Sequence, residues 1–125
     1  MQKALNKTGR PIYYQISNDG AENVWEWGAP LANQWSVHRG SQDTWQSLVD
    51  TVDLLQGKEK FASRGAWNSP GFLQLGNGGL KYKEYQAQFA LWCILKAPLI
   101  IGNDLSKMNK NMEDILSNEE IIEIN

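Results

Sequence analysis

The sequence predicts an α/β fold with a parallel sheet, and three observations indicate it. Segments rich in aromatic and β-branched residues alternate with segments whose apolar residues recur at helical spacing. The apolar run at residues 98–101 contains no polar residue, which is typical of a strand covered on both faces. The 125 residues are 42% hydrophobic and 21% charged, which is ordinary for one small globular domain and argues against disorder.

The first part of the chain predicts the end of a helix and two strands. Residues 1–7 have the pattern of a helix end, and Gly9 is placed to stop it. Residues 11–17 are rich in aromatic and β-branched residues and predict a buried strand, which a turn follows. Residues 21–33 predict irregular structure, and residues 34–38 predict a second, short strand.

The remainder predicts three helices and a third strand. Asp43 is a candidate N-cap for a helix over the residues that follow it. A second amphipathic helix is predicted at residues 83–96, and the third strand is the apolar run at 98–101. A short helix is predicted at residues 110–116, after which Ser117 caps a last turn. The segments between these elements predict loops.

Three local signals favour structural roles over chemical ones. The loop at residues 76–79 lacks the Lys-Ser/Thr pair of a phosphate-binding loop, so a plain turn is favoured. His38 is the only histidine, which excludes a histidine-based metal cluster and favours packing at a strand end over a role as general base. Cys93 is the only cysteine, which excludes a disulfide within the chain and predicts a small core residue.

The charge balance excludes further classes of function. Lys and Arg number 12, Asp and Glu number 14, and the formal charge of −2 argues against a strongly basic nucleic-acid surface. The first ten residues contain no apolar run of the kind that a signal peptide has, and the longest apolar stretch is too short to span a bilayer. No nucleic-acid or membrane partner is expected, and the compartment stays open.

Six tryptophans in so short a chain indicate either a dense aromatic core or a surface lined with rings. Trp45 and Trp92 lie at helical spacing among apolar residues and are predicted to be core. The other four lie in predicted loops or at strand ends: Trp25, Trp27, Trp35 and Trp67. Rings in such places form sugar-binding platforms or pack loops, and the sequence pattern alone leaves both open.

Several motifs together resemble the second half of an α-galactosidase (melibiase) barrel, of the family that includes α-N-acetylgalactosaminidases. The matching segments run in order over nearly the whole chain: 4–12 (ALNKTGRPI), 25–29 (WEWGA), 43–45 (DTW), 65–68 (GAWN), 75–80 (LGNGGL), 84–85 (EY), 96–105 (KAPLIIGNDL) and 115–122 (ILSNEEII).

The resemblance implies a partial (β/α)₈ barrel, roughly strands five to eight with their helices, so that residues 1–125 are the C-terminal half and the N-terminal half is absent. Such enzymes remove terminal α-galactosyl groups with retention, using one aspartate as nucleophile and another as acid/base, without metal or cofactor. In the family, the nucleophile ends the strand before the helix with which this chain begins. Family members are often secreted, lysosomal or vacuolar.

The differences between this sequence and the family's motifs are concentrated at the positions that form the family's sugar pocket. The pattern W-R-x-x-G-D-I-x-D-S-W corresponds to residues 35–45, which places the acid/base position on Gly40 and the sugar-binding arginine on Ser36. W-N-D-P-D-M corresponds to residues 67–72, with both aspartates replaced, and C-E-W-G corresponds to residues 17–20. By position, the candidate substrate-binding residues are these: Ser17, Asp19, Ser36, Trp67 and Phe72.

These departures predict that no catalytic residue of the family is retained, and they leave three interpretations. The chain is part of a retaining glycoside hydrolase and is inactive alone, or a non-catalytic relative that binds carbohydrate, or a barrel fragment without a function of its own. The expected ligand is a sugar of the α-galactoside type. The open sheet edges of half a barrel invite pairing, so we expect either an N-terminal barrel half or another copy of the chain to cover them.

Overall fold

The computed structural model describes residues 1–125 as an α/β fold with a parallel sheet, as the sequence predicts. The sheet has the order β1 (Gln15–Ile16), β2 (Gln34–Ser36) and β3 (Trp67–Ser69), and both pairings are parallel. Beyond β3, Leu73 forms a single parallel bridge with Ile101. The helices are these: α1 (Gln2–Asn6), α2 (Val24–Trp27), α3 (Trp45–Leu55), α4 (Tyr82–Ile94), α5 (Lys110–Leu116) and α6 (Glu119–Ile122).

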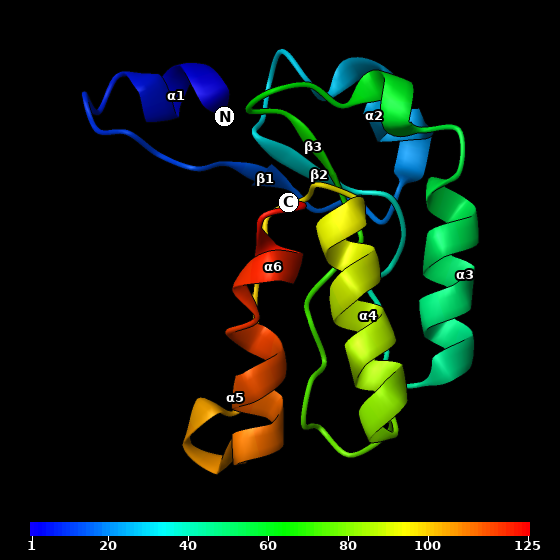
Figure 1. Cartoon of the computed structure of the whole chain (residues 1–125). Helices are drawn as coiled ribbons and strands as arrows, with labels where there is room; N and C mark the ends of the chain where they lie inside the picture. The colour runs from blue at the N-terminus through cyan, green and yellow to red at the C-terminus, as the bar shows by residue number, and fades with distance from the viewer.

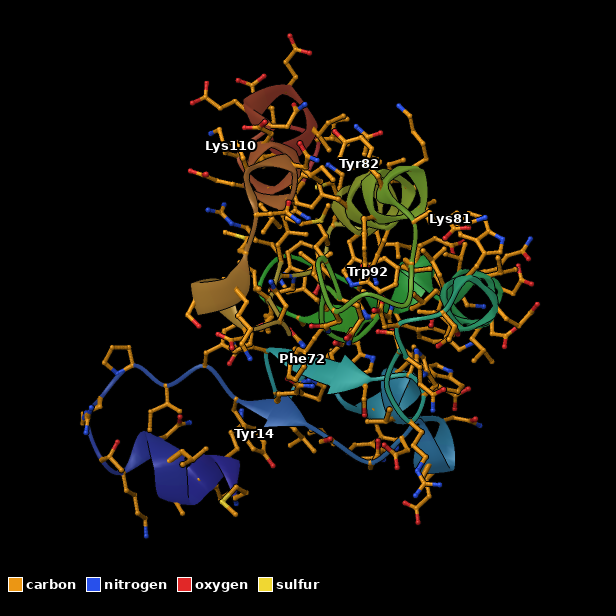
Figure 2. The ribbon with its side chains drawn as sticks, turned by 90° about the horizontal axis from the view of Figure 1, so that it is seen from below. Tyr14, Phe72, Lys81, Tyr82, Trp92 and Lys110 are labelled. Carbon is orange, nitrogen blue, oxygen red and sulfur yellow. The ribbon has the colours of Figure 1, made fainter.

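The helices are arranged in the order of the chain around the sheet. α3 and α4 lie side by side, and α5 and α6 both contact α4 (Figure 1). Seen from below, the elements follow an arc, with α1 and β1 at one end and α5 and α6 at the other (Figure 2). No helix is long and apolar enough to cross a membrane.

Side chains cap the first turns of α3 and α6, but in each helix the capping residue is not the predicted one. Thr44, not Asp43, caps α3, because its hydroxyl accepts a 3.3 Å hydrogen bond from the Ser47 N–H. The cap of α6 is Asn118, whose side chain accepts from the Ile121 N–H at 3.1 Å. Ser117 instead donates its hydroxyl to a carbonyl of α5.

The strands differ more from prediction than the helices. The ladder of β1 is shorter than residues 11–17, because the Tyr14 N–H bonds the Asn33 side chain instead of a neighbouring strand. The strand β3 was not predicted at all. Two of its three residues, Asn68 and Ser69, are polar. Both are buried, and each forms a hydrogen bond with a residue far away in sequence.

The predicted strand at 98–101 is also wrong in its detail. Only Ile101 pairs, in the bridge with Leu73, and its side chain is 40% exposed. The run therefore forms one bridge to one neighbouring segment and no continuous strand.

Two hydrophobic clusters hold the helices on the sheet. The larger joins α3, α4 and α5 with the segment after β3 and contains Trp92 and Cys93, both fully buried as predicted. The smaller surrounds Trp35, which is fully buried between the sheet and the helices. Trp45 is 46% exposed, so its predicted core role is wrong: it begins α3 and precedes the first buried residue of that helix, Leu48.

Candidate functional site

A cavity of about 210 Å³ lies at the carboxyl ends of the three strands. In parallel α/β proteins this edge of the sheet is where ligands bind. The lining is almost entirely polar: Gln15, Ser17, Asp19, Ser36, His38, Arg39, Gly40, Ser41, Ser69, Gly71, Phe72 and Gln74. Hydroxyl and amide groups of this kind suit a small ligand that carries several hydroxyl groups.

A row of hydrogen bonds crosses the sheet and reaches the cavity at Ser69 and Gly71. The Tyr13 hydroxyl donates to Gln34 at 2.9 Å, and the Gln34 amide donates to the Ser69 hydroxyl at 2.8 Å. The same hydroxyl accepts from the Gly71 N–H at 3.3 Å. Gln34 and Ser69 are both buried, so this row fixes side chains of β2 and β3 where the cavity begins.

Ser36 holds the loop that follows β1. Its hydroxyl accepts from the backbone N–H groups of Asn18, at 3.2 Å, and Asp19, at 3.1 Å. Asp19 has a φ of 57°, a left-handed conformation that aspartate tolerates better than most residues. These contacts place the Asp19 carboxylate in the cavity lining.

His38 is held in its neutral form. Its Nδ1 accepts from the Gly40 N–H at 3.0 Å, so Nδ1 carries no proton, and Nε2 lies 3.0 Å from the Thr51 hydroxyl. Thr51 donates to the Ser47 carbonyl, so the remaining bond runs from Nε2–H to Thr51. Burial lowers the pKa of His38, and the Pro70 backbone and the Asp19 charge oppose this only in part. Both ring nitrogens are engaged, which is consistent with the predicted structural role.

One face of α4 holds the loop that forms the cavity's far wall. The Trp92 indole N–H donates to the Gly71 carbonyl at 3.0 Å, and Gln88 accepts from the Gln74 N–H at 3.0 Å. Tyr85 lies one turn before Gln88, and its hydroxyl accepts from the Gly78 N–H at 2.7 Å. Tyr85, Gln88 and Trp92 lie on one face of the helix, and their spacing in the sequence could have indicated that this face holds the loop.

The charged groups of the lining are few. Asp19 is its only carboxylate, and Arg39 is its only cation. Gly40 has a φ of 93°, and a Cβ built there would meet no atom within 4 Å. No group of three or more His, Cys, Asp or Glu side chains is arranged to hold a metal ion.

The structure brings four of the five predicted binding residues together and separates the fifth. Four line the cavity: Ser17, Asp19, Ser36 and Phe72. Trp67 begins β3 and lines a different cavity, of about 570 Å³, together with residues of α3 and α4. None of the six tryptophans lines the polar cavity. Trp25, for example, packs under the Lys58 ammonium group, 4.5 Å from its ring centre.

Other cavity residues were not singled out from the sequence. Gln15 and Gln74 lie outside the segments that match family motifs, and Ser69 replaces a family aspartate. These residues all lie at the end of a strand, or shortly after one, at the same edge of the sheet. This position could identify them from the sequence only if β3 were predicted first.

The sequence of this chain is similar to those of known proteins over its full length. The family model described as Alpha galactosidase A matches residues 1–125. Alpha-galactosidase 3 of Arabidopsis thaliana is 40% identical over 125 residues, which are all of this chain and 29% of that protein. The alpha-N-acetylgalactosaminidase of Gallus gallus is 35% identical over 139 aligned residues, covering 100% of this chain and 33% of that protein.

Solved structures of two enzymes have the same fold as this chain over almost its whole length. The alpha-galactosidase of Saccharomyces cerevisiae superposes with a TM-score of 0.90 at 28% identity, over 99% of this chain and 32% of that chain. A β-L-arabinopyranosidase of Geobacillus stearothermophilus superposes with a TM-score of 0.89 at 25% identity, over 98% and 32%. The chain thus spans about a third of the length of the relatives it matches. The chain belongs to the alpha-galactosidase A family.

Proposed function

We propose that this chain forms the second half of the (β/α)₈ barrel of a retaining glycoside hydrolase that cleaves terminal α-galactosyl residues, and that the chain alone binds sugar without hydrolysing it. The family membership and the named activities of the relatives support the first part. The observation that carries the second part is the single carboxylate, Asp19, in the cavity lining, with Gly40 at the position of the family's acid/base.

The chemistry explains why one carboxylate is insufficient. Retaining hydrolysis needs a nucleophilic carboxylate and a second carboxyl group about 5–5.5 Å away to protonate the leaving oxygen. Loss of a general acid alone typically removes a factor of about 10² to 10⁴ in rate. Without the nucleophile no glycosyl–enzyme intermediate forms. Asp19 cannot serve in both positions, and His38 is held neutral by two hydrogen bonds.

The lining nevertheless offers many groups that could hold a sugar. Ser17, Gln15 and Gln74 provide hydroxyl and amide groups, and Asp19 provides a charged acceptor. Phe72 is 50% exposed at the rim and supplies an apolar surface of the kind that packs against a sugar ring. A pyranose with the hydroxyl pattern of galactose is the ligand class that the relatives' activities suggest.

The test combines turnover and binding on the purified chain. With 4-nitrophenyl α-galactoside we expect no release of nitrophenol above the uncatalysed rate. With galactose at millimolar concentration we expect amide NMR shifts at Gly40, Gly71 and Gln74. Because no tryptophan lines the cavity, tryptophan fluorescence is the weaker readout.

Two variants make this test specific. Asp19→Asn is expected to weaken galactose binding several-fold, whereas Asp104→Asn, at an exposed carboxylate that does not line the cavity, is expected to leave it unchanged. Sustained turnover by the wild-type chain that is lost in Asp19→Asn contradicts the proposed inactivity. Absence of galactose-dependent shifts contradicts the proposed binding.

A further inference from the structure

The cavity that Trp67 lines takes no part in the proposed function. Its volume of about 570 Å³ is within the range of sites that hold small organic molecules. Trp67 begins β3, whereas Ser69 ends the same strand and lines the polar cavity, so the two cavities lie at opposite ends of β3. All of its lining residues lie between positions 52 and 96, on α3, β3, α4 and the segments that join them. The interior of the chain therefore forms this site.

Most of the wall of this cavity is apolar. Val52 and Leu55 come from α3, Ile94 and Leu95 come from the end of α4, and Trp67 contributes an indole ring. Sugar hydroxyl groups would lose hydrogen bonds to water against such a surface, which is unfavourable. An apolar ring or alkyl chain gains free energy when the same surface covers it. The wall therefore suits a ligand with an apolar body.

The charges around the cavity favour a cation. Asp53 and Glu59 line it, and neither forms an ion pair within the chain. α3 and α4 run side by side in the same direction (Figure 1), and both end here, because their last residues, Leu55 and Ile94, are part of the lining. The C-terminal end of a helix carries a partial negative charge. Two carboxylates and two helix ends outweigh the single cation of the lining, Lys96.

The chain already holds one ammonium group in comparable surroundings. The Lys58 ammonium donates to the Leu54 carbonyl in the last turn of α3 and lies 4.5 Å from the centre of the Trp25 ring. The carbonyl accepts its protons, and the face of the ring attracts its charge. The cavity offers the same combination to a ligand, because Trp67 lines it together with the ends of α3 and α4.

We propose that this cavity binds a small amphiphilic cation, an organic molecule with an apolar body and one ammonium group. The body packs against Trp67, Leu55 and Ile94, and the ammonium group lies toward Asp53 and Glu59. Binding of this kind needs neither a sugar nor a catalytic carboxylate. The inference therefore goes beyond the proposed function and can fail or succeed independently of it.

The experiment uses three probes that differ mainly in the charge at one end: 4-phenylbutylammonium, 4-phenylbutanol and 4-phenylbutanoate. Each is titrated into the 125-residue chain while NMR follows the Trp67 indole N–H and the amides of residues 94–96. The cation should bind at least about tenfold more tightly than the alcohol, because only the cation interacts favourably with the carboxylates, the helix ends and the ring face. The anion should bind more weakly than the alcohol.

Variants test whether the named residues cause this preference. The double variant Asp53→Asn, Glu59→Gln should reduce the preference for the cation over the alcohol to less than about threefold. A matched control, Glu119→Gln with Glu120→Gln, removes the same formal charge from exposed side chains of α6 outside the lining and should keep the preference. Trp67→Phe should weaken binding of the cation more than binding of the alcohol, because the phenyl ring attracts a cation less strongly.

Several outcomes contradict the proposal. They are absence of binding at millimolar probe, equal affinities of the three probes, tightest binding of the anion, and a preference that survives in the Asp53, Glu59 variant or disappears in the control. Saturating galactose should leave the affinity for the cation unchanged. Competition by galactose, or shifts at Gly40 and Gly71 in place of Trp67, would locate the probe in the polar cavity and also contradict the proposal. Circular dichroism confirms that each variant is folded.

Discussion

The Tyr85 hydroxyl donates a 2.9 Å hydrogen bond to the Asp43 carboxylate, which joins α4 to the loop before α3 across 42 positions of sequence. The same hydroxyl accepts from the Gly78 N–H, and the same carboxylate oxygen accepts from the Gly79 N–H. Tyr85 is 3% exposed, and burial raises the pKa of its hydroxyl. The pair thus closes the glycine-rich loop that the sequence suggested was a plain turn.

Replacing Tyr85 with phenylalanine should destabilise the chain by about 1–3 kcal/mol, because it removes the buried hydroxyl that accepts from the Gly78 N–H and leaves the Asp43 carboxylate with one donor fewer. Urea unfolding measures this free energy. Tyr82→Phe, on the exposed side of the same helix, is the control and should change stability by less than about 0.5 kcal/mol. Equal losses in the two variants would show that the buried hydroxyl has no special role.

Gly79→Ala should be much more damaging than Gly78→Ala. A Cβ at Gly79 would lie inside van der Waals contact of the Asp43 backbone carbonyl, so we expect a loss of more than about 3 kcal/mol or no cooperative unfolding transition. At Gly78 a Cβ meets nothing, and only its φ of 98° is unfavourable, at about 1–2 kcal/mol. Similar unfolding midpoints for both variants would contradict the close approach of Asp43 to the loop.

His38 should make stability fall on mild acidification. Because the folded-state pKa is lowered, the neutral form contributes stability that is present above the ordinary pKa of about 6.5 and is lost as pH falls through the folded-state value. Between pH 7.5 and 5.5 the melting temperature of the wild type should fall. His38→Gln should lower the melting temperature at pH 7.5 and flatten this slope. Since the chain has one histidine, parallel slopes in both proteins would refute the assignment.

Gly40→Asp should not restore hydrolysis. The position has room for a side chain, but its φ of 93° is costly for aspartate, and the cavity still lacks a second carboxylate in the required place. We expect a folded protein that melts a few degrees lower and releases no nitrophenol from the aryl galactoside. Gly57→Asp is the control for strain, because Gly57 has a φ of 78° and an equally open surrounding. Turnover in Gly40→Asp, and not in Gly57→Asp, would show that Asp19 and the introduced aspartate together suffice for hydrolysis.

The helices were more predictable from the sequence than the strands, for a physical reason. Helical periodicity is local, so α3, α4 and α5 emerge from their own residues. The strand β3 depends on Asn68 accepting from the Trp35 indole and Ser69 accepting from Gln34, contacts that no nearby residue indicates. Family motifs located four of the predicted residues in the cavity lining, but they could not indicate that Trp67 faces another cavity or that Trp35 is buried against the helices.

The row of hydrogen bonds from Tyr13 through Gln34 and Ser69 to Gly71 bears on how such a fold can be divided. A sheet face built from hydroxyl and amide groups loses little when water replaces a neighbouring strand, whereas an aliphatic face would lose its packing. An open edge beside this polar face therefore costs the fold less than an open edge beside an aliphatic sheet face would.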